Sequence, residues 1–102
     1  MRRESFTRDK VLEELRHLKP VLEKQYGVMR IGIFGSFAKN KIREDTDIDV
    51  VIELKEPDLF SLVHIKKALE EDFHRRVDVI SLREHMNPYL KRRIQTEAIY
   101  VW

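Results

Sequence analysis

The chain has 102 residues, enough for one small domain over residues 1–102, and a net charge of +2 at pH 7. Its apolar fraction of 42% argues against disorder over most of its length, and the absence of cysteine excludes disulfides and thiolate metal sites. The small basic excess suits polyanionic ligands such as nucleotides, but we expect no direct nucleic-acid binding.

Membrane and export signals are not recognisable in the sequence. No apolar run approaches the roughly 18 residues that cross a bilayer. No apolar segment follows the basic residues of the start, Met1 to Phe6, so we expect no secretory signal. We therefore expect a cytoplasmic protein with no membrane partner.

A helical repeat of apolar residues predicts a helix from about residue 7 to residue 25. Thr7 can accept hydrogen bonds as the N-cap, and Asp9 lies in the first turn, where negative charge is favoured. Pro20 should kink or split this helix near Leu18, and Gly27 should end it. The apolar stripe consists of Val11, Leu12, Leu15, Leu18 and Leu22.

After Gly27 the chain alternates short apolar runs with helical patterns. The predicted strands cover residues 28–34, 47–54 and 76–82, with a short strand or a packed tail at 98–102. The predicted helices cover residues 59–74, capped by Asp58, and 88–97, which begins at Pro88, with a short helical turn at 36–39. This order predicts a small α/β (α+β) fold, with a three- to four-stranded mixed sheet and helices packed mainly on one face.

Three aspartates stand in the predicted strands, where aspartate is uncommon. Asp47 and Asp49 share one strand face, about 7 Å apart, while Ile48 and Val50 point to the core. Asp78 joins the same face if the third strand lies beside the second. Three close carboxylates should raise one another's pKa values and bind a divalent cation such as Mg²⁺. A solvent-facing position at a strand end is the alternative, and it is strongest for Asp47.

Gly35 and Ser36 follow the first predicted strand directly. Gly35 lets the backbone approach a ligand, and the Ser36 hydroxyl with nearby free amides can bind an anion. The pair is neither a Walker loop nor a dinucleotide fingerprint. In the loop that follows, Lys39, Lys41 and Arg43 can contact triphosphate oxygens, although a solvated loop is the alternative for at least two of them.

Two segments together resemble the signature of the DNA polymerase β-like nucleotidyltransferase superfamily. They are Gly35-Ser36-Phe37-Ala38 and, after the charged loop, Thr46-Asp47-Ile48-Asp49-Val50-Val51. The minimal members, the MNT proteins, are similar over nearly the whole chain, including residues 77–79 and 97–100. This chain has Lys39 and Asn40 where the family often has arginine and glycine. Asparagine tolerates left-handed backbone angles, so we expect the loop to keep its shape.

The resemblance implies a nucleotidyltransferase fold and a specific reaction. Gly35 and Ser36 would bind the triphosphate, and Asp47 and Asp49 would hold two Mg²⁺ ions. Asp78 would help to bind one metal ion and activate the acceptor hydroxyl. That hydroxyl would attack the α-phosphorus of ATP, or of another nucleoside triphosphate, in line with the leaving pyrophosphate.

The chain ends at Trp102, soon after the predicted core, so we expect another protein or a second copy to supply the acceptor. The resemblance implies an antitoxin that transfers AMP to a tyrosine of a partner HEPN RNase toxin. Two alternatives stay open: a binding module that neutralises its partner by contact alone, and a transferase acting on an aminoglycoside-like small molecule.

Overall fold

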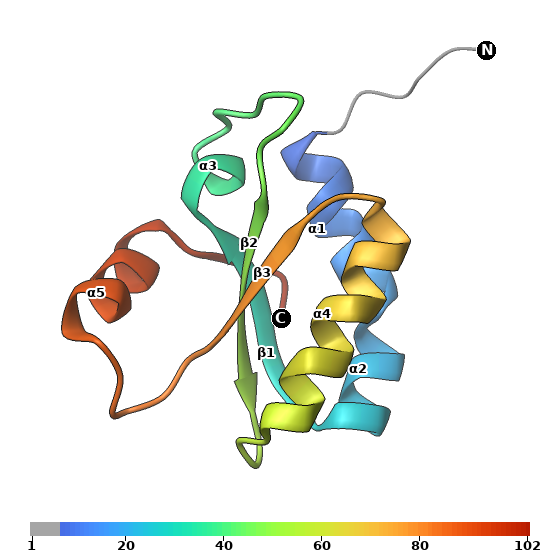
Figure 1. Ribbon diagram of the computed structural model, residues 1–102, viewed down its shortest axis with the longest axis vertical. Helices are drawn as coiled ribbons and strands as arrows, with labels where there is room; N and C mark the ends of the chain where they lie inside the picture. Colours follow the sequence, from blue (N-terminus) through green and yellow to red (C-terminus); the bar gives the residue numbers. More distant parts are fainter. Residues whose placement is uncertain (1–6) are drawn as a thin grey trace.

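In the computed structural model, which describes residues 7–102, a central sheet carries helices on both faces (Figure 1). The prediction about a secretory signal concerns residues 1–6 and lies outside this range. The sheet has four strands in the order β3-β2-β1-β4, with β2 and β3 parallel and β1 antiparallel to both of its neighbours. This arrangement confirms the predicted small mixed sheet. The strands are β1 (Val28–Phe34), β2 (Ile48–Leu54), β3 (Val77–Ser81) and β4 (Ile99–Tyr100).

The helices divide unevenly between the two faces of the sheet. Three of them cover one face, a short one follows β1, and α5 covers the other face alone (Figure 1). In residues 7–102 no helix is both long enough and apolar enough to cross a membrane. The helices are α1 (Arg8–His17), α2 (Lys19–Tyr26), α3 (Gly35–Ala38), α4 (Leu59–Phe73) and α5 (Pro88–Glu97).

Local sequence signals explain where the helices begin and end. The Thr7 side chain caps α1 by accepting a hydrogen bond from the Lys10 N–H at 3.2 Å. Leu18 separates α1 from α2, with Pro20 in the first turn of α2, where its missing N–H costs little. Gly27 ends α2 in the left-handed region at φ +68. The predicted split at Pro20 and the predicted stop at Gly27 are therefore confirmed.

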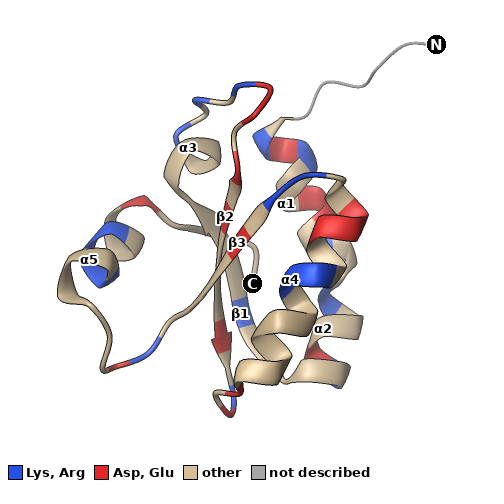
Figure 2. Cartoon of the chain, viewed as in Figure 1, with Lys and Arg blue, Asp and Glu red and all other residues tan. Residues whose placement is uncertain are grey.

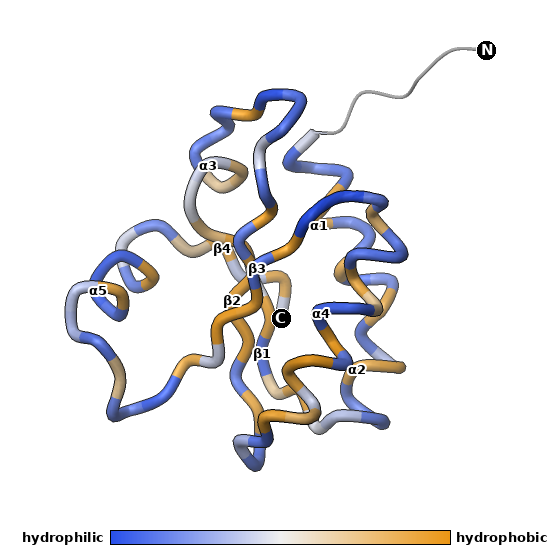
Figure 3. Tube along the Cα trace, in the orientation of Figure 1, coloured by the Kyte–Doolittle hydropathy of each residue, from blue (hydrophilic) through white to orange (hydrophobic). Residues whose placement is uncertain are grey.

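The apolar residues form two cores of different size. The larger lies between the sheet and α1, α2 and α4, where Leu15, Ile31 and Leu69 are fully buried. The smaller lies under α5 and consists of Phe34, Val51 and Ile94. The central strands are correspondingly apolar in Figure 3. Because both faces of β2 bury apolar side chains, Asp49 stands on a partly buried face rather than on a solvent face.

The observed boundaries differ slightly from the predicted ones. Asp47 lies immediately before β2, because the ladder begins with the Ile48 N–H, which donates to the Arg76 carbonyl at 3.0 Å. Strand β3 is one residue shorter at each end than predicted. The helical turn expected at residues 36–39 begins at Gly35 and ends at Ala38.

Ile94 should hold α5 on the sheet, because it is the fully buried residue of that helix. We expect Ile94→Ala to lower the free energy of unfolding by about 2–5 kcal/mol, through lost burial and a new cavity. Gln95→Ala, at the exposed neighbouring position, should change it by less than about 0.5 kcal/mol. Urea unfolding monitored by circular dichroism measures both. Equal losses in the two variants would contradict this account of α5.

Candidate functional site

Asp49 and Asp78 lie side by side on neighbouring strands. The parallel pairing of β2 with β3 sets Asp49 opposite Asp78, and the antiparallel pairing of β1 with β2 sets Phe34 opposite Asp49. Asp49 is half-buried, whereas Asp78 is exposed on the edge strand of the sheet. Acidic residues therefore stand together near the starts of β2 and β3, and α5 carries basic residues (Figure 2). The predicted adjacency of these two carboxylates is confirmed.

The environment of Asp49 disfavours its ionised form. Burial and the charge of Asp78 raise the pKa of Asp49 to about 6, and Asp47 and Glu97 add to this effect. The guanidinium of Arg93 acts in the opposite direction. The predicted rise in pKa is thus found at Asp49. A bound cation would remove the cost of keeping this carboxylate ionised.

Asp47 completes the acidic group from the loop before β2. It is half-buried, and its charge reaches Asp49. Within residues 7–102, no three acidic, histidine or cysteine side chains converge closely enough to hold a metal ion unaided. The donor set still fits Mg²⁺, which binds proteins through one or two carboxylates and completes its octahedron with water and phosphate oxygens.

The turn at Gly35 lies in close contact with Asp49. Gly35 is buried and has φ +73, in the left-handed region that side chains disfavour. A Cβ atom built on Gly35 would collide with the Asp49 carboxylate. Ser36 is half-buried in the turn that follows. The structure therefore places Gly35, the first residue of the predicted anion-binding pair, against Asp49, a predicted metal ligand.

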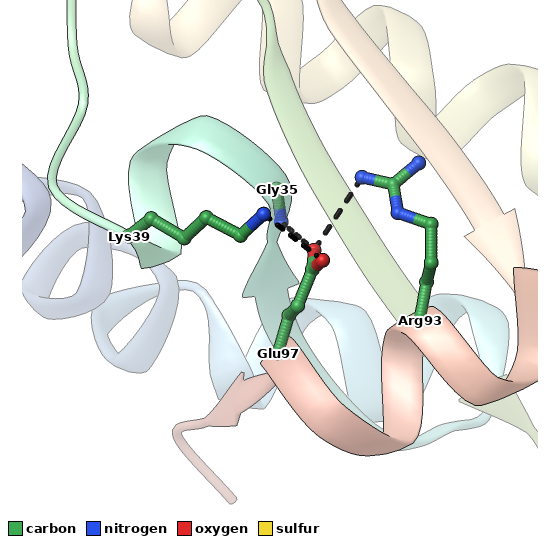
Figure 4. A network of polar contacts seen from close by, with 4 residues as sticks. All are labelled: Gly35, Lys39, Arg93 and Glu97. Atoms are coloured by element: carbon green, nitrogen blue, oxygen red, sulfur yellow. Dashed lines mark hydrogen bonds and ion pairs between the residues drawn. The ribbon is translucent and has the colours of Figure 1, made fainter.

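A carboxylate at the end of α5 joins this turn to two cations (Figure 4). The Gly35 N–H donates to Glu97 Oε1 at 3.2 Å, and Lys39 Nζ lies 3.1 Å from Glu97 Oε2. The Arg93 guanidinium donates to Glu97 Oε1 at 3.4 Å. Burial opposes the ionisation of Glu97, but hydrogen bonds from Lys39 and Arg93 outweigh it and lower the pKa of Glu97.

Arg93 and Glu97 belong to this candidate site by their contacts, although the sequence did not predict them as site residues. Glu97 appeared there only as part of the family-like tail at residues 97–100. Their spacing of i and i+4 on one predicted helix is a signal for an ion pair, but it does not indicate the partner Lys39. Finding that contact requires knowing that the end of α5 lies beside the turn after β1.

A cleft of about 310 Å³ opens between the sheet and α5. Carboxylates and cations stand in its walls together with apolar side chains, so it offers both charged and apolar contacts to a ligand. The residues that line it are Phe34, Asp49, Lys66, Asp78, Val79, Ile80, Leu90 and Arg93.

The loop between the Gly-Ser turn and β2 is held mainly through its backbone. Asn40 adopts the left-handed region at φ 61, as expected for a residue replacing glycine. Arg43 is exposed, and the structure does not place it among the residues lining the cleft. Its carbonyl and that of Thr46 accept hydrogen bonds from Arg75 at 3.1 and 2.8 Å. Arg75 thereby fixes the residue that precedes Asp47.

Comparison with known proteins identifies the family. The family model of polymerase beta nucleotidyltransferases matches residues 16–102. MJ0126 of Methanocaldococcus jannaschii, described as a candidate protein adenylyltransferase, is 36% identical over 96 residues, covering 93% of this chain and 98% of that protein.

Solved structures share the fold. The structure of a candidate minimal nucleotidyltransferase superposes with a TM-score of 0.76 at 31% identity, over 95% of this chain and 98% of the other. A complex of a tri-AMPylated HEPN toxin with an MNT antitoxin from Shewanella oneidensis matches with a TM-score of 0.69 at 18% identity, over 94% of this chain and 72% of that one. The second likeness concerns the fold alone. Since the family model covers most of the chain, the protein belongs to the polymerase beta nucleotidyltransferase family and is a nucleotidyltransferase.

Proposed function

We propose that the protein transfers AMP from ATP to a tyrosine hydroxyl of a partner HEPN toxin, and that it acts in this way as an antitoxin. The observation that carries the proposal is the Asp49–Asp78 pair beside the Gly35 turn, in a chain of a nucleotidyltransferase family. The relative described as a candidate protein adenylyltransferase supports AMP as the transferred group. The complex of the same fold with an AMPylated HEPN toxin supports the acceptor.

The positions of the candidate site residues suggest a separate role for each of them. Gly35 and Ser36 would receive the β- and γ-phosphates at the end of β1, with Lys39 beside them. Asp47 and Asp49 would hold the Mg²⁺ ions, because Asp49 lies against that turn at the start of β2 and Asp47 lies just before the strand, where its charge acts on Asp49. Asp78 stands on the edge strand and is exposed, so an acceptor arriving from outside can reach it.

The reaction forms one bond to phosphorus and breaks another. The acceptor oxygen attacks the α-phosphorus of ATP, and the bond from that phosphorus to its bridging oxygen breaks, so that pyrophosphate leaves with the electron pair. Asp78 accepts the proton of the attacking hydroxyl. Mg²⁺ held by Asp47 and Asp49 would supply charge stabilisation for this displacement. The half-buried face under α5 limits access of water to Asp49.

Removing the carboxylates of Asp47 and Asp49 should strongly reduce the rate of transfer. We expect the double variant Asp47→Ala, Asp49→Ala to lose about 100-fold or more in rate, because metal-assisted charge stabilisation supplies several kcal/mol. The assay follows label from ATP, in the presence of Mg²⁺, to the product of the neighbouring gene, which is the expected HEPN partner. Asp45→Ala removes an exposed carboxylate from the same loop and should retain activity.

Two results would contradict the proposal. One is label transfer by the double variant at the rate of the unchanged chain. The other is the absence of transfer from the unchanged chain to the HEPN protein. If the double variant still protected cells from that toxin, neutralisation by contact alone would replace catalysis as the explanation.

In the metal-free protein, ionisation of Asp49 should lower the free energy of unfolding. Its pKa of about 6 in the folded chain exceeds its ordinary value of 3.8, so the folded state binds the proton more tightly than the unfolded state. Stability should therefore fall as the pH rises through this interval. We expect Asp49→Asn to raise the melting temperature at about pH 8, and the gain to shrink towards about pH 4.

Thermal unfolding at both pH values, with and without Mg²⁺ and a non-hydrolysable ATP analogue, measures this effect. The ligands should stabilise the unchanged chain more than Asp49→Asn, because only the former keeps the carboxylate. A gain that is equal at both pH values would show that ionisation of Asp49 is not its cause.

A further inference from the structure

The carboxylate of Glu97 contacts three donor groups that come from separate parts of the fold. The Gly35 N–H belongs to the turn after β1, Lys39 follows α3, and Arg93 lies one helical turn before Glu97 on α5 (Figure 4). A single side chain thus connects the proposed phosphate-binding turn with the cations of Lys39 and Arg93.

The backbone of Glu97 is itself held firmly. The Ala98 N–H donates to the Ile94 carbonyl at 2.8 Å at the end of α5. Strand β4 follows at once and pairs with β1, where Tyr100 lies opposite Gly32. A Cβ atom on Gly32 would lie only 2.5 Å from the Ile99 carbonyl oxygen, so the two strands are in close contact there. Glu97 is therefore fixed in position relative to the end of β1.

Glu97 uses only part of the hydrogen-bonding capacity of its cations. The side chains of Lys39 and Arg93 are 49% and 39% exposed, whereas that of Glu97 is 14% exposed. An ammonium group has three N–H donors and a guanidinium has five, so donors remain for a ligand. Arg93 also lines the cleft with Asp49 and Asp78. Two cations and one carboxylate leave this group with a net positive charge.

We propose that Glu97 is a positioning residue for the phosphates of the nucleotide. This inference rests on the proposed function and extends it to a residue outside the Gly-Ser and aspartate motifs. The Glu97 carboxylate holds the Gly35 turn and orients Lys39 and Arg93, so that their remaining donors meet the triphosphate. Long cationic side chains lose much rotamer freedom when they bind, and a fixed carboxylate partner imposes that loss before the nucleotide arrives.

Glu97→Gln tests the proposal in the full chain. The amide oxygen can still accept from the Gly35 N–H, but the ion pairs with Lys39 and Arg93 are lost. We expect the Kd for a non-hydrolysable ATP analogue with Mg²⁺, measured by calorimetry, to rise about tenfold. The KM for ATP should rise with it, while kcat and the melting temperature stay close to those of the unchanged chain. Glu84→Gln makes the same charge change at an exposed position and should leave Kd unchanged.

A mutant cycle separates positioning from a general charge effect. If Glu97 acts through Lys39 and Arg93, then Glu97→Gln should weaken binding far less in a background that carries both Lys39→Met and Arg93→Met. An equal effect in both backgrounds would overturn the proposal. So would tighter binding by Glu97→Gln, which would show that the carboxylate competes with the phosphates. If the unchanged chain bound no nucleotide, the proposed function would fail as well, whereas an unchanged Kd in Glu97→Gln sinks this inference alone.

Discussion

The close approach of the Gly35 turn to the Asp49 carboxylate governs the geometry of this site. Neither a side chain on Gly35 nor an ordinary backbone angle is compatible with it. The approach places the turn that follows β1 beside the first carboxylate of β2, and the pairing of β2 with β3 then adds Asp78. The backbone of this turn can therefore lie against the Asp49 carboxylate only because the residue at position 35 is glycine.

The two faces of the sheet contribute unequally to the stability of the fold. One face carries a large apolar core under α1, α2 and α4, which supplies most of the burial. The other carries a small core under α5 and leaves room for the cleft. Asp49 can remain ionised on a half-buried face because the opposite face stabilises the sheet. Stability and chemistry are thus assigned to different sides of the same strands.

Much of the fold could be predicted from the sequence because its signals are local. Pro20 marks the break between α1 and α2, Gly27 marks the end of α2, and alternation along β2 separates Asp49 from the core residues. Strand order is not local, so the pairing of Asp49 with Asp78 was predicted only on the condition that β3 lies beside β2. The contact between Gly35 and Glu97 joins residues 62 positions apart and depends on the pairing of β4 with β1, which no local pattern encodes.

The short strand β4 has a consequence for how the two parts of the candidate site are held. Asp49 and Asp78 are brought together by the pairing of β2 with β3, whereas Glu97 lies between α5 and β4, which pairs with β1. The two parts therefore depend on different edges of the same sheet. A change that separates β4 from β1 would release Glu97 from the Gly35 turn while leaving the two aspartates paired.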